Sequence, residues 1–188
     1  MHKQSTASAW VARFAAIIPA GEVLDLACGS GRHARHLAAL GHPVTALDRD
    51  AEALALAAGP GIATMQYDLE GEGAAWPFAA GRFAGIVVTN YLHRPLLAQI
   101  AASLRPDGVL LYETFAIGNE AFGKPSNPAF LLERGELLRF ADACGLQVLA
   151  FEDGYCAAPK AAMLQRLCAA GPAFTPSNAV LDAVSGRE

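Results

Sequence analysis

The chain has 188 residues, of which 53% are hydrophobic and 17% are charged, and its formal net charge at pH 7 is −4. This composition excludes a disordered chain, and the length allows one domain with a full core but not two comfortable ones. The acidic balance gives no electrostatic footprint for DNA or RNA, and no apolar run approaches the roughly 18 residues of a membrane span. The four cysteines form no Cys-x-x-Cys pair or His/Cys cluster, which predicts reduced thiols, a cytoplasmic protein and no metal site.

Strands and helices alternate along the first half of the sequence. Apolar residues between Trp10 and Ile18 share one helical face, which predicts a helix near the N-terminus. Short apolar runs and helical patterns then alternate, predicting strands at 22–28, 42–48 and 62–69 and helices at 32–40 and 51–58. A polar, glycine-rich stretch at 70–82 predicts a loop.

The second half continues the alternation and then changes. It predicts strands at 83–92 and 108–115, helices at 95–104 and 133–144, an irregular loop at 117–131, and two final strands at 146–153 and 161–169. The fold class is therefore α/β, a doubly wound, mostly parallel seven-stranded sheet of the Rossmann-like kind. Because no helix separates the last two strands, we expect them to form an antiparallel C-terminal hairpin. We expect a single domain over 1–188, with its core at 8–170 and a loosely ordered tail at 171–188.

The first predicted strand runs into a glycine-rich loop and a helix, in the stretch "LDLACGSGRHARHL" at residues 24–37. Glycines let a ligand approach the backbone, and the N–H groups at the helix start point at it, so this arrangement is typical of nucleotide binding. The glycine pattern fits both NAD and S-adenosylmethionine (SAM). Asp25 favours SAM, since an acid would repel the phosphates of NAD but attract the ammonium and sulfonium groups of SAM. The alternative is that Asp25 caps N–H groups of its own loop.

Two more acids end the next two predicted strands. Asp48 lies near the roughly 20-residue spacing expected of an acid that binds ribose hydroxyls; its alternative role is a helix cap, for which Asp50 is better placed. Asp68 ends the third strand, where it could bind the adenine edge together with the backbone of Leu69. Because strand ends beside a topological switch point meet in one crevice, we expect these acids to surround one cofactor.

These motifs resemble those of the class I SAM-dependent methyltransferases over nearly all of residues 8–170. "VLDLACGSG" is similar to their first motif, with Ala27 where the first of three glycines often stands, "TALDRD" is similar to the ribose-acid motif, and "YDLE" to the adenine motif. "FAGIVVTNYL" and "LRPDGVLLYETF" resemble their fourth and fifth strands. The family's antiparallel seventh strand agrees with the predicted hairpin. Within the family the chain is similar to compact enzymes of the tellurite-resistance type, and to a bacterial branch with "NYLHRPLL" and "FGKPSNPAFLLERGEL".

The residues and the resemblance together predict SAM as the cofactor. Asn90 and Tyr91, after the fourth strand, could contact its methionine part. Cys28 could be a nucleophile, but a small residue that allows tight packing is the simpler interpretation. The predicted cofactor-binding residues are Asp25, Ala27, Cys28, Gly29, Gly31, Asp48, Arg49, Asp68, Leu69, Asn90 and Tyr91.

Three residues are candidates for the chemistry. Methyl transfer from SAM is an in-line displacement on an already electrophilic sulfonium, so positioning supplies much of the rate. His93 is the candidate general base, or else only a helix-start residue. Arg94 could clamp an anionic acceptor or pair with Glu113. Glu113 itself could face the acceptor, or form an ion pair without a catalytic role.

Two further segments could complete the site. The loop at 117–131 is long enough to be a substrate lid, with Lys124 and Asn127 as its polar candidates. Arg13 could reach the carboxylate of SAM, although a surface arginine is the simpler interpretation.

The leading hypothesis is SAM-dependent methyl transfer to a small-molecule acceptor, with no nucleic-acid, membrane or metal partner. One alternative is an NAD-linked oxidoreductase, and another is a SAM-binding regulatory protein without turnover. An RNA or protein acceptor is a further, less favoured alternative: the acidic balance argues against RNA, and "NYL" lacks the Asn-Pro-Pro-aromatic signature of amino-directed DNA and RNA methyltransferases.

Overall fold

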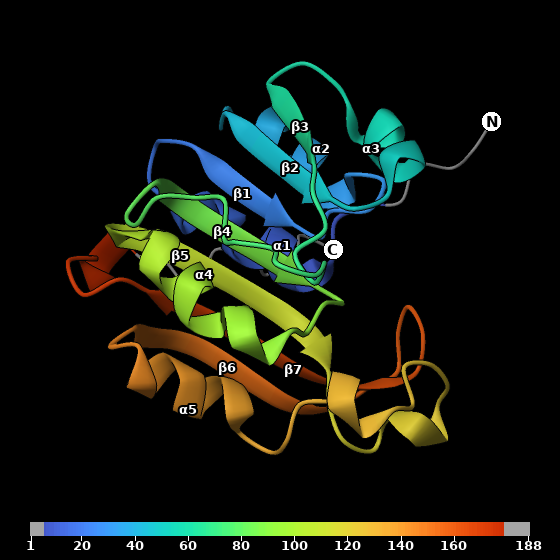
Figure 1. Cartoon of the computed structure of the whole chain (residues 1–188). Coiled ribbons are helices and arrows are strands. Elements are labelled where there is room, and N and C mark those ends of the chain that lie inside the picture. Colours follow the sequence, from blue (N-terminus) through green and yellow to red (C-terminus); the bar gives the residue numbers. More distant parts are fainter. Residues whose placement is uncertain (1–5, 179–188) are drawn as a thin grey trace, which may run out of the picture.

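A computed structural model describes residues 6–178 of the protein (Figure 1). Its centre is one seven-stranded sheet with the order β3-β2-β1-β4-β5-β7-β6. The strands are β1 Val23–Leu26, β2 Val44–Asp48, β3 Ile62–Gln66, β4 Phe83–Thr89, β5 Leu104–Phe115, β6 Gln147–Cys156 and β7 Ala162–Ala170. Neighbours pair in parallel except at β7, which runs antiparallel to both β5 and β6. The predicted fold class and terminal hairpin are therefore confirmed.

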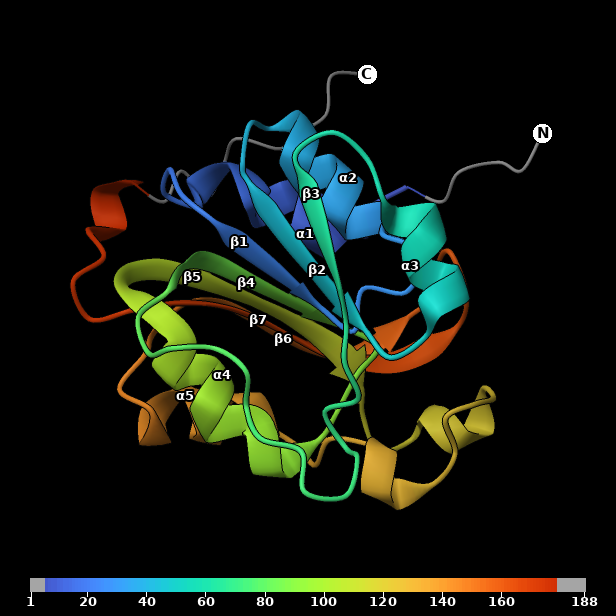
Figure 2. The ribbon, with the colours of Figure 1, turned by 45° about the horizontal axis from the view of Figure 1, so that its top comes forward.

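Helices cover both faces of this sheet, as Figure 2 shows. One face carries α1 Ala9–Phe14, α2 Arg32–Ala39 and α3 Ala51–Ala57, and the other carries α4 Leu97–Ser103 and α5 Glu136–Ala143. Alternate side chains of the strands feed two apolar clusters. The first includes Trp10, Phe14 and Leu37, and the second includes Leu110 and Phe140. Burial on both faces explains why β1 and β4 read as continuous apolar runs.

Left-handed residues set two boundaries that differ from the sequence prediction. β4 ends at Thr89 rather than at 92, because Asn90 turns the chain with a φ of 55°. The helix predicted from 133 begins at Glu136, directly after Gly135, whose φ is 63°. The loop at 117–131 contains two short 3-10 helices, Asn119–Ala121 and Pro128–Phe130. Polar ends of strands and these turns therefore gather at the carboxyl edge of the sheet.

The prediction of a loose tail is wrong for its first part. Phe174 is buried in the first apolar cluster, which lies on the face that carries α1 and is called the α1-side cluster below. Ala173 N–H donates to the carbonyl oxygen of Pro106 at 2.8 Å. The Gln147 side-chain amide donates to the carbonyl oxygens of Gly171, Pro172 and Phe174. One aromatic side chain and these bonds hold the segment, whereas residues 179–188 lie outside the described part of the chain.

Candidate active site

A cavity of about 300 Å³ opens at the carboxyl ends of four neighbouring strands. Seven of the ten residues that line it were predicted to bind the cofactor: Ala27, Asp48, Arg49, Asp68, Leu69, Asn90 and Tyr91. Sequence reasoning missed the other three, Leu47, Tyr67 and Glu70. The strand order reverses between β1 and β4, which is where a doubly wound sheet binds its ligand. Each missed residue is the chain neighbour of a predicted one, and this adjacency could have identified it.

The loop between β1 and α2 has an unusual backbone. Ala27 has a φ of 54°, and the only other described non-glycine residue with positive φ is Asn90, which lines the same cavity. A side chain in this conformation costs roughly 1–3 kcal/mol, and such strain concentrates at functional sites. Gly31, with a φ of 75°, leads directly into α2. The loop thus holds its N–H groups in a shape that the sequence does not favour locally.

Asp48 braces this loop with one carboxylate oxygen and its own β2–α3 turn with the other. Gly29 N–H donates to Oδ2 at 2.7 Å, and Asp50 N–H donates to Oδ1 at 3.0 Å. The helix cap of α3 is Asp50, whose side chain accepts from the N–H groups of Glu52 and Ala53, so Asp48 does not serve that role. An ionised carboxylate has about four acceptor positions, and Asp48 keeps some of them for a ligand in the cavity.

Asp25 is fully buried and performs one of its two predicted roles. Its Oδ2 accepts the Ala34 N–H in the first turn of α2 at 2.8 Å, which is the capping alternative. Its Oδ1 has no hydrogen-bond partner within residues 6–178. Burial raises the pKa of this carboxyl to about 7. An orphaned buried oxygen is costly, and a cationic ligand group nearby would satisfy it.

Two side chains of the loop and of α2 are buried and neutral. Burial raises the pKa of the Cys28 thiol to about 12, which argues against a nucleophile and favours the packing interpretation. His33, which sequence reasoning missed, accepts from Ser8 N–H at Nε2 (3.2 Å) and lies 3.3 Å from Thr89 Oγ1 at Nδ1. Burial, aided by Arg32, lowers the pKa of His33 to about 3. His33 therefore links α1, α2 and β4 as an uncharged imidazole.

His93 is not part of the cavity lining but lies beside Glu70, which is. Its Nδ1 is 3.6 Å from Oε2 of Glu70, and both side chains are partly exposed. It precedes a 3-10 helix, Arg94–Leu96, but its side chain makes no capping bond there. Tyr91, on the cavity wall, has a hydroxyl whose pKa is raised by burial and by the charge of Glu70. A carboxylate beside an imidazole is the arrangement of a base with an orienting partner.

Arg94 does not pair with Glu113, so that prediction is wrong. Its guanidinium forms a bidentate pair with Glu136, at 2.7 and 2.9 Å. It also donates to the carbonyl oxygens of Ala129 and Leu131 at 2.8 and 2.9 Å. These bonds fasten the end of the 117–131 loop to α5, and the sequence could not show this because it depends on how α5 packs.

Glu113 is buried and pairs with Arg166, at 2.5 Å between Oε2 and Nε. Arg166 also donates to Oε2 of Glu152 at 2.9 Å. Sequence reasoning missed Arg166, although an antiparallel hairpin beside β5 makes a cross-strand charge pair a natural expectation. Arg13 pairs with Glu152 at 3.7 Å and does not line the cofactor cavity.

The two polar candidates of the 117–131 loop differ in their hydrogen bonds. The Asn127 side chain accepts from the N–H of Ala129 and caps the helix Pro128–Phe130. Lys124 makes no hydrogen bond or ion pair among the described residues. Within residues 6–178 no group of three or more His, Cys, Asp and Glu side chains is placed to hold a metal ion, and no helix is long and apolar enough to cross a membrane.

The charges of the cavity distinguish the two cofactors. Carboxylates of Asp48, Asp68 and Glu70 face Arg49, the single basic residue of the lining. A pyrophosphate would meet this acidic wall unfavourably, whereas the ammonium and sulfonium of SAM meet it favourably. Together with the orphaned oxygen of Asp25, the residues present fit SAM and do not fit NAD.

Comparisons with known proteins agree with this assignment. Residues 23–108 match the family model of a methyltransferase domain. A SAM-dependent methyltransferase from Mesorhizobium loti shares the fold with a TM-score of 0.67 and 19% identity, over 87% of this chain and 98% of that one. TehB from Haemophilus influenzae gives 0.64 and 21%, over 82% of this chain and 59% of its own. A geranyl diphosphate methyltransferase gives 0.65 and 16%, over 86% and 74%. No curated protein sequence matches significantly.

Residues 23–108 match a methyltransferase domain, and the whole sheet shares its fold with solved SAM-dependent methyltransferases. The cofactor that this domain and the acidic cavity lining fit is S-adenosylmethionine, which carries an electrophilic methyl group on a sulfonium. The resemblance stated from the sequence is confirmed, and the oxidoreductase alternative is not.

Proposed function

We propose that the protein transfers the methyl group of SAM to a small-molecule acceptor, with the cofactor held in the cavity at the ends of β1 to β4. The observation that carries this proposal is the pair of acids, Asp48 and Asp68, that line one cavity from the ends of successive strands. Asp48 would accept the ribose hydroxyls on its remaining lone pairs. Asp68, whose Oδ1 accepts the Glu70 N–H at 2.9 Å, would offer Oδ2 to the adenine amino group.

The methionine part of SAM would lie against the opposite wall. Asn90 and Tyr91 would contact it there, while Asp25, which is buried outside the cavity lining, would hold the start of α2 through the Ala34 N–H. Bound there, SAM would supply a methyl group that the lone pair of the acceptor displaces from the sulfonium, which would leave as a neutral thioether. Where the acceptor is protic, His93 takes the proton at its imidazole, oriented by Glu70.

A small molecule is the acceptor class that composition and neighbours favour. The net charge of −4 gives no attraction for a polyanionic nucleic acid. The geranyl diphosphate methyltransferase that shares the fold was crystallised with GPP, a small molecule.

Calorimetry with SAM and S-adenosylhomocysteine tests the cofactor site. Because each hydrogen bond to a charged group contributes about 1.5–3 kcal/mol, Asp48→Ala should weaken binding by about 100-fold. Asp142→Ala, which removes an exposed carboxylate of α5, is the matched control and should bind as the wild type does. Equal affinities of the Asp48 variant and the wild type would refute this placement of the ribose.

Turnover is tested with methyl-labelled SAM and a metabolite extract. The wild type should produce a labelled small molecule, and His93→Ala should lower its rate without changing the affinity for S-adenosylhomocysteine. SAM binding without any labelled product would instead favour the regulatory alternative.

A further inference from the structure

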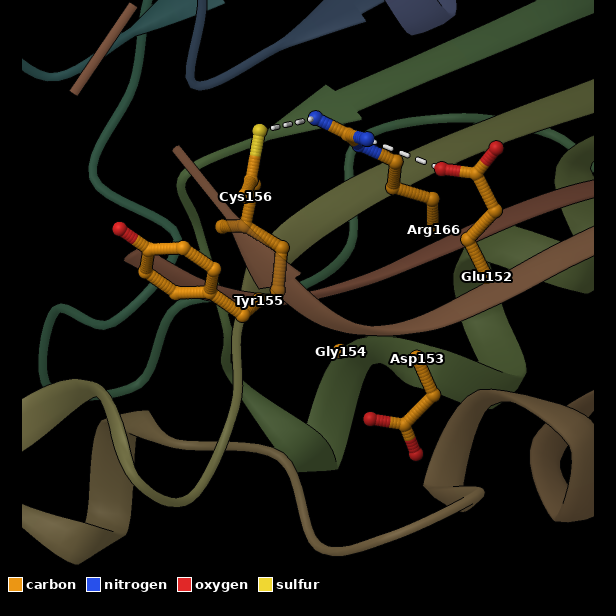
Figure 3. A pocket seen from close by; sticks show the side chains of 7 residues that line it. Glu152, Asp153, Gly154, Tyr155, Cys156 and Arg166 are labelled. Carbon is orange, nitrogen blue, oxygen red and sulfur yellow. Dashed lines mark hydrogen bonds and ion pairs between the residues drawn. The ribbon is translucent and has the colours of Figure 1, made fainter. Parts of the chain in front are cut away.

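A second cavity, of about 220 Å³, lies on β6 and β7 (Figure 3). The residues lining it are Glu152, Asp153, Gly154, Tyr155 and Cys156 of β6 and Leu164 and Arg166 of β7. In Figure 3 the guanidinium of Arg166 lies between Cys156 and Glu152, while Asp153 points away from them. None of these residues belongs to the cofactor cavity, so this second site has its own chemistry.

Glu113 joins the two cavities. Its carbonyl oxygen accepts the N–H of Asn90, on the wall of the cofactor cavity, at 2.9 Å. Its carboxylate accepts from Arg166, on the wall of the second cavity. Strand register places Thr89, Glu113 and Arg166 side by side on β4, β5 and β7. Two strand spacings separate the end of β4 from Arg166, which is about 10 Å.

The guanidinium of Arg166 is already neutralised. Its Nε donates to Glu113, its Nη1 to Glu152, and its Nη2 contacts Cys156 Sγ at 3.4 Å. Arg13 contacts the other oxygen of Glu152, Oε1, at 3.7 Å, and is itself partly exposed. Within the lining, the two carboxylates of Glu152 and Asp153 stand against the one guanidinium of Arg166, so the cavity wall carries a net negative charge and a further anion would be repelled there.

The rim of this cavity is aromatic and apolar. Tyr155 is 58% exposed, and its ring centroid lies 5.1 Å from that of Phe122 in the 117–131 loop, which is 39% exposed. Leu164 adds an aliphatic wall. Aromatic faces beside a carboxylate favour a cation, through the ring quadrupole as well as the charge.

We infer that this second cavity is the distal part of the acceptor site and that it takes a cationic amine group of the acceptor. The inference rests on the proposed function. The acceptor then spans about 10 Å, with its ammonium group against Glu152 and its methylated atom at the cofactor cavity. Arg166 and Glu113 position the carboxylate of Glu152, and the 117–131 loop covers the apolar part of the acceptor.

Calorimetry on protein loaded with S-adenosylhomocysteine tests this assignment with two probes of similar shape, 2-phenylethylammonium and 3-phenylpropionate. The ammonium should bind, and the carboxylate should bind at least about fivefold more weakly. Glu152→Gln should weaken the ammonium about fivefold, which is the size expected for a half-exposed ion pair. Glu133→Gln, which breaks an exposed pair with Arg139, is the matched control and should change nothing. Equal or tighter binding of the carboxylate, or no binding of the ammonium, would overturn the inference.

The thiol of Cys156 gives a second readout that needs no probe affinity. Its thiolate attacks a methanethiosulfonate, forms a mixed disulfide and releases methanesulfinate. The trimethylammonium-ethyl reagent should modify Cys156 faster than the sulfonatoethyl reagent, and Glu152→Gln should reduce this ratio. Cys144, half-buried after α5, is the internal reference, and peptide mass spectrometry separates the sites. A faster anionic reagent would mean that Arg166 dominates and that the inference is wrong.

The two proposals fail separately. If the protein binds S-adenosylhomocysteine but both charge tests give the opposite sign, only the acceptor assignment falls. If it does not bind S-adenosylhomocysteine, the proposed function falls, while the Cys156 rates still report the charge preference of the second cavity.

Discussion

Burial raises the pKa of Asp25 to about 7, against a value of 3.8 for an unperturbed aspartate, although the Ala34 N–H and Arg32 act in the opposite direction. Between about pH 4 and pH 7 the folded protein therefore keeps a proton that the unfolded chain has lost. Stability falls wherever the folded state binds more protons and the pH is raised. Asp25 thus destabilises the fold progressively across this window, and the cost is complete above pH 7.

Asp25→Asn should remove this pH dependence. The amide oxygen still accepts the Ala34 N–H, and the side chain cannot ionise. We expect the free energy of unfolding of the variant to exceed that of the wild type increasingly from pH 4 to pH 7, with a constant difference above. Urea unfolding at several pH values measures it. Curves that stay parallel across this range would show that Asp25 does not titrate there.

The residues of the site differ in how far the sequence could predict them. Asp48 and Asp68 follow apolar strands directly, and alternating strands and helices bring their carboxyl ends to one edge, so chain order alone places them together. The partners of Arg94 and Glu113 depend on where α5 and β7 pack. Such contacts are between residues distant in sequence, and no local pattern specifies them.

At the scale of elements, the start of α2 lies directly against the end of α3. An added Cβ at Gly31 would lie 2.5 Å from the Cβ of Ala57 and 2.8 Å from its Cα. An added Cβ at Gly29 would meet nothing within 4 Å, although both glycines have positive φ, at 75° and 53°. Comparing alanine substitutions at Gly29 and Gly31 therefore separates the cost of backbone strain from the cost of steric crowding.

We predict that Gly29→Ala costs about 1 kcal/mol of stability, from its left-handed backbone alone. Gly31→Ala carries the same strain and also pushes α3 away from α2, so it should cost at least about 2 kcal/mol more. Chemical unfolding of both variants at one pH checks this. Equal losses would indicate that the two helices can separate without cost.

At the scale of the whole molecule, the sequence predicted the order of helices and strands but not the packing of the segment that follows β7. Alternating periodicities fix a doubly wound sheet, and two strands without a helix between them indicate the reversed β7. The segment after β7 shows no helical or strand pattern of its own, so the sequence predicts a loose tail. Its anchoring depends on carbonyl groups at the start of β5 and on Gln147, both remote in sequence.

Phe174 tests whether this segment belongs to the folded core. It is 5% exposed within the α1-side cluster, so Phe174→Ala should cost about 3 kcal/mol, the lower end of the range for a buried phenylalanine. Phe130→Ala is the matched control, because that side chain is 48% exposed in the 117–131 loop and should cost less than about 0.5 kcal/mol. Urea unfolding compares the two. Because the Phe174 segment is held at β5 and β6, its loss should loosen the sheet opposite the carboxyl edge, and affinity for S-adenosylhomocysteine should stay close to that of the wild type. A variant that unfolds like the Phe130 control would mean that the core ends at Ala170.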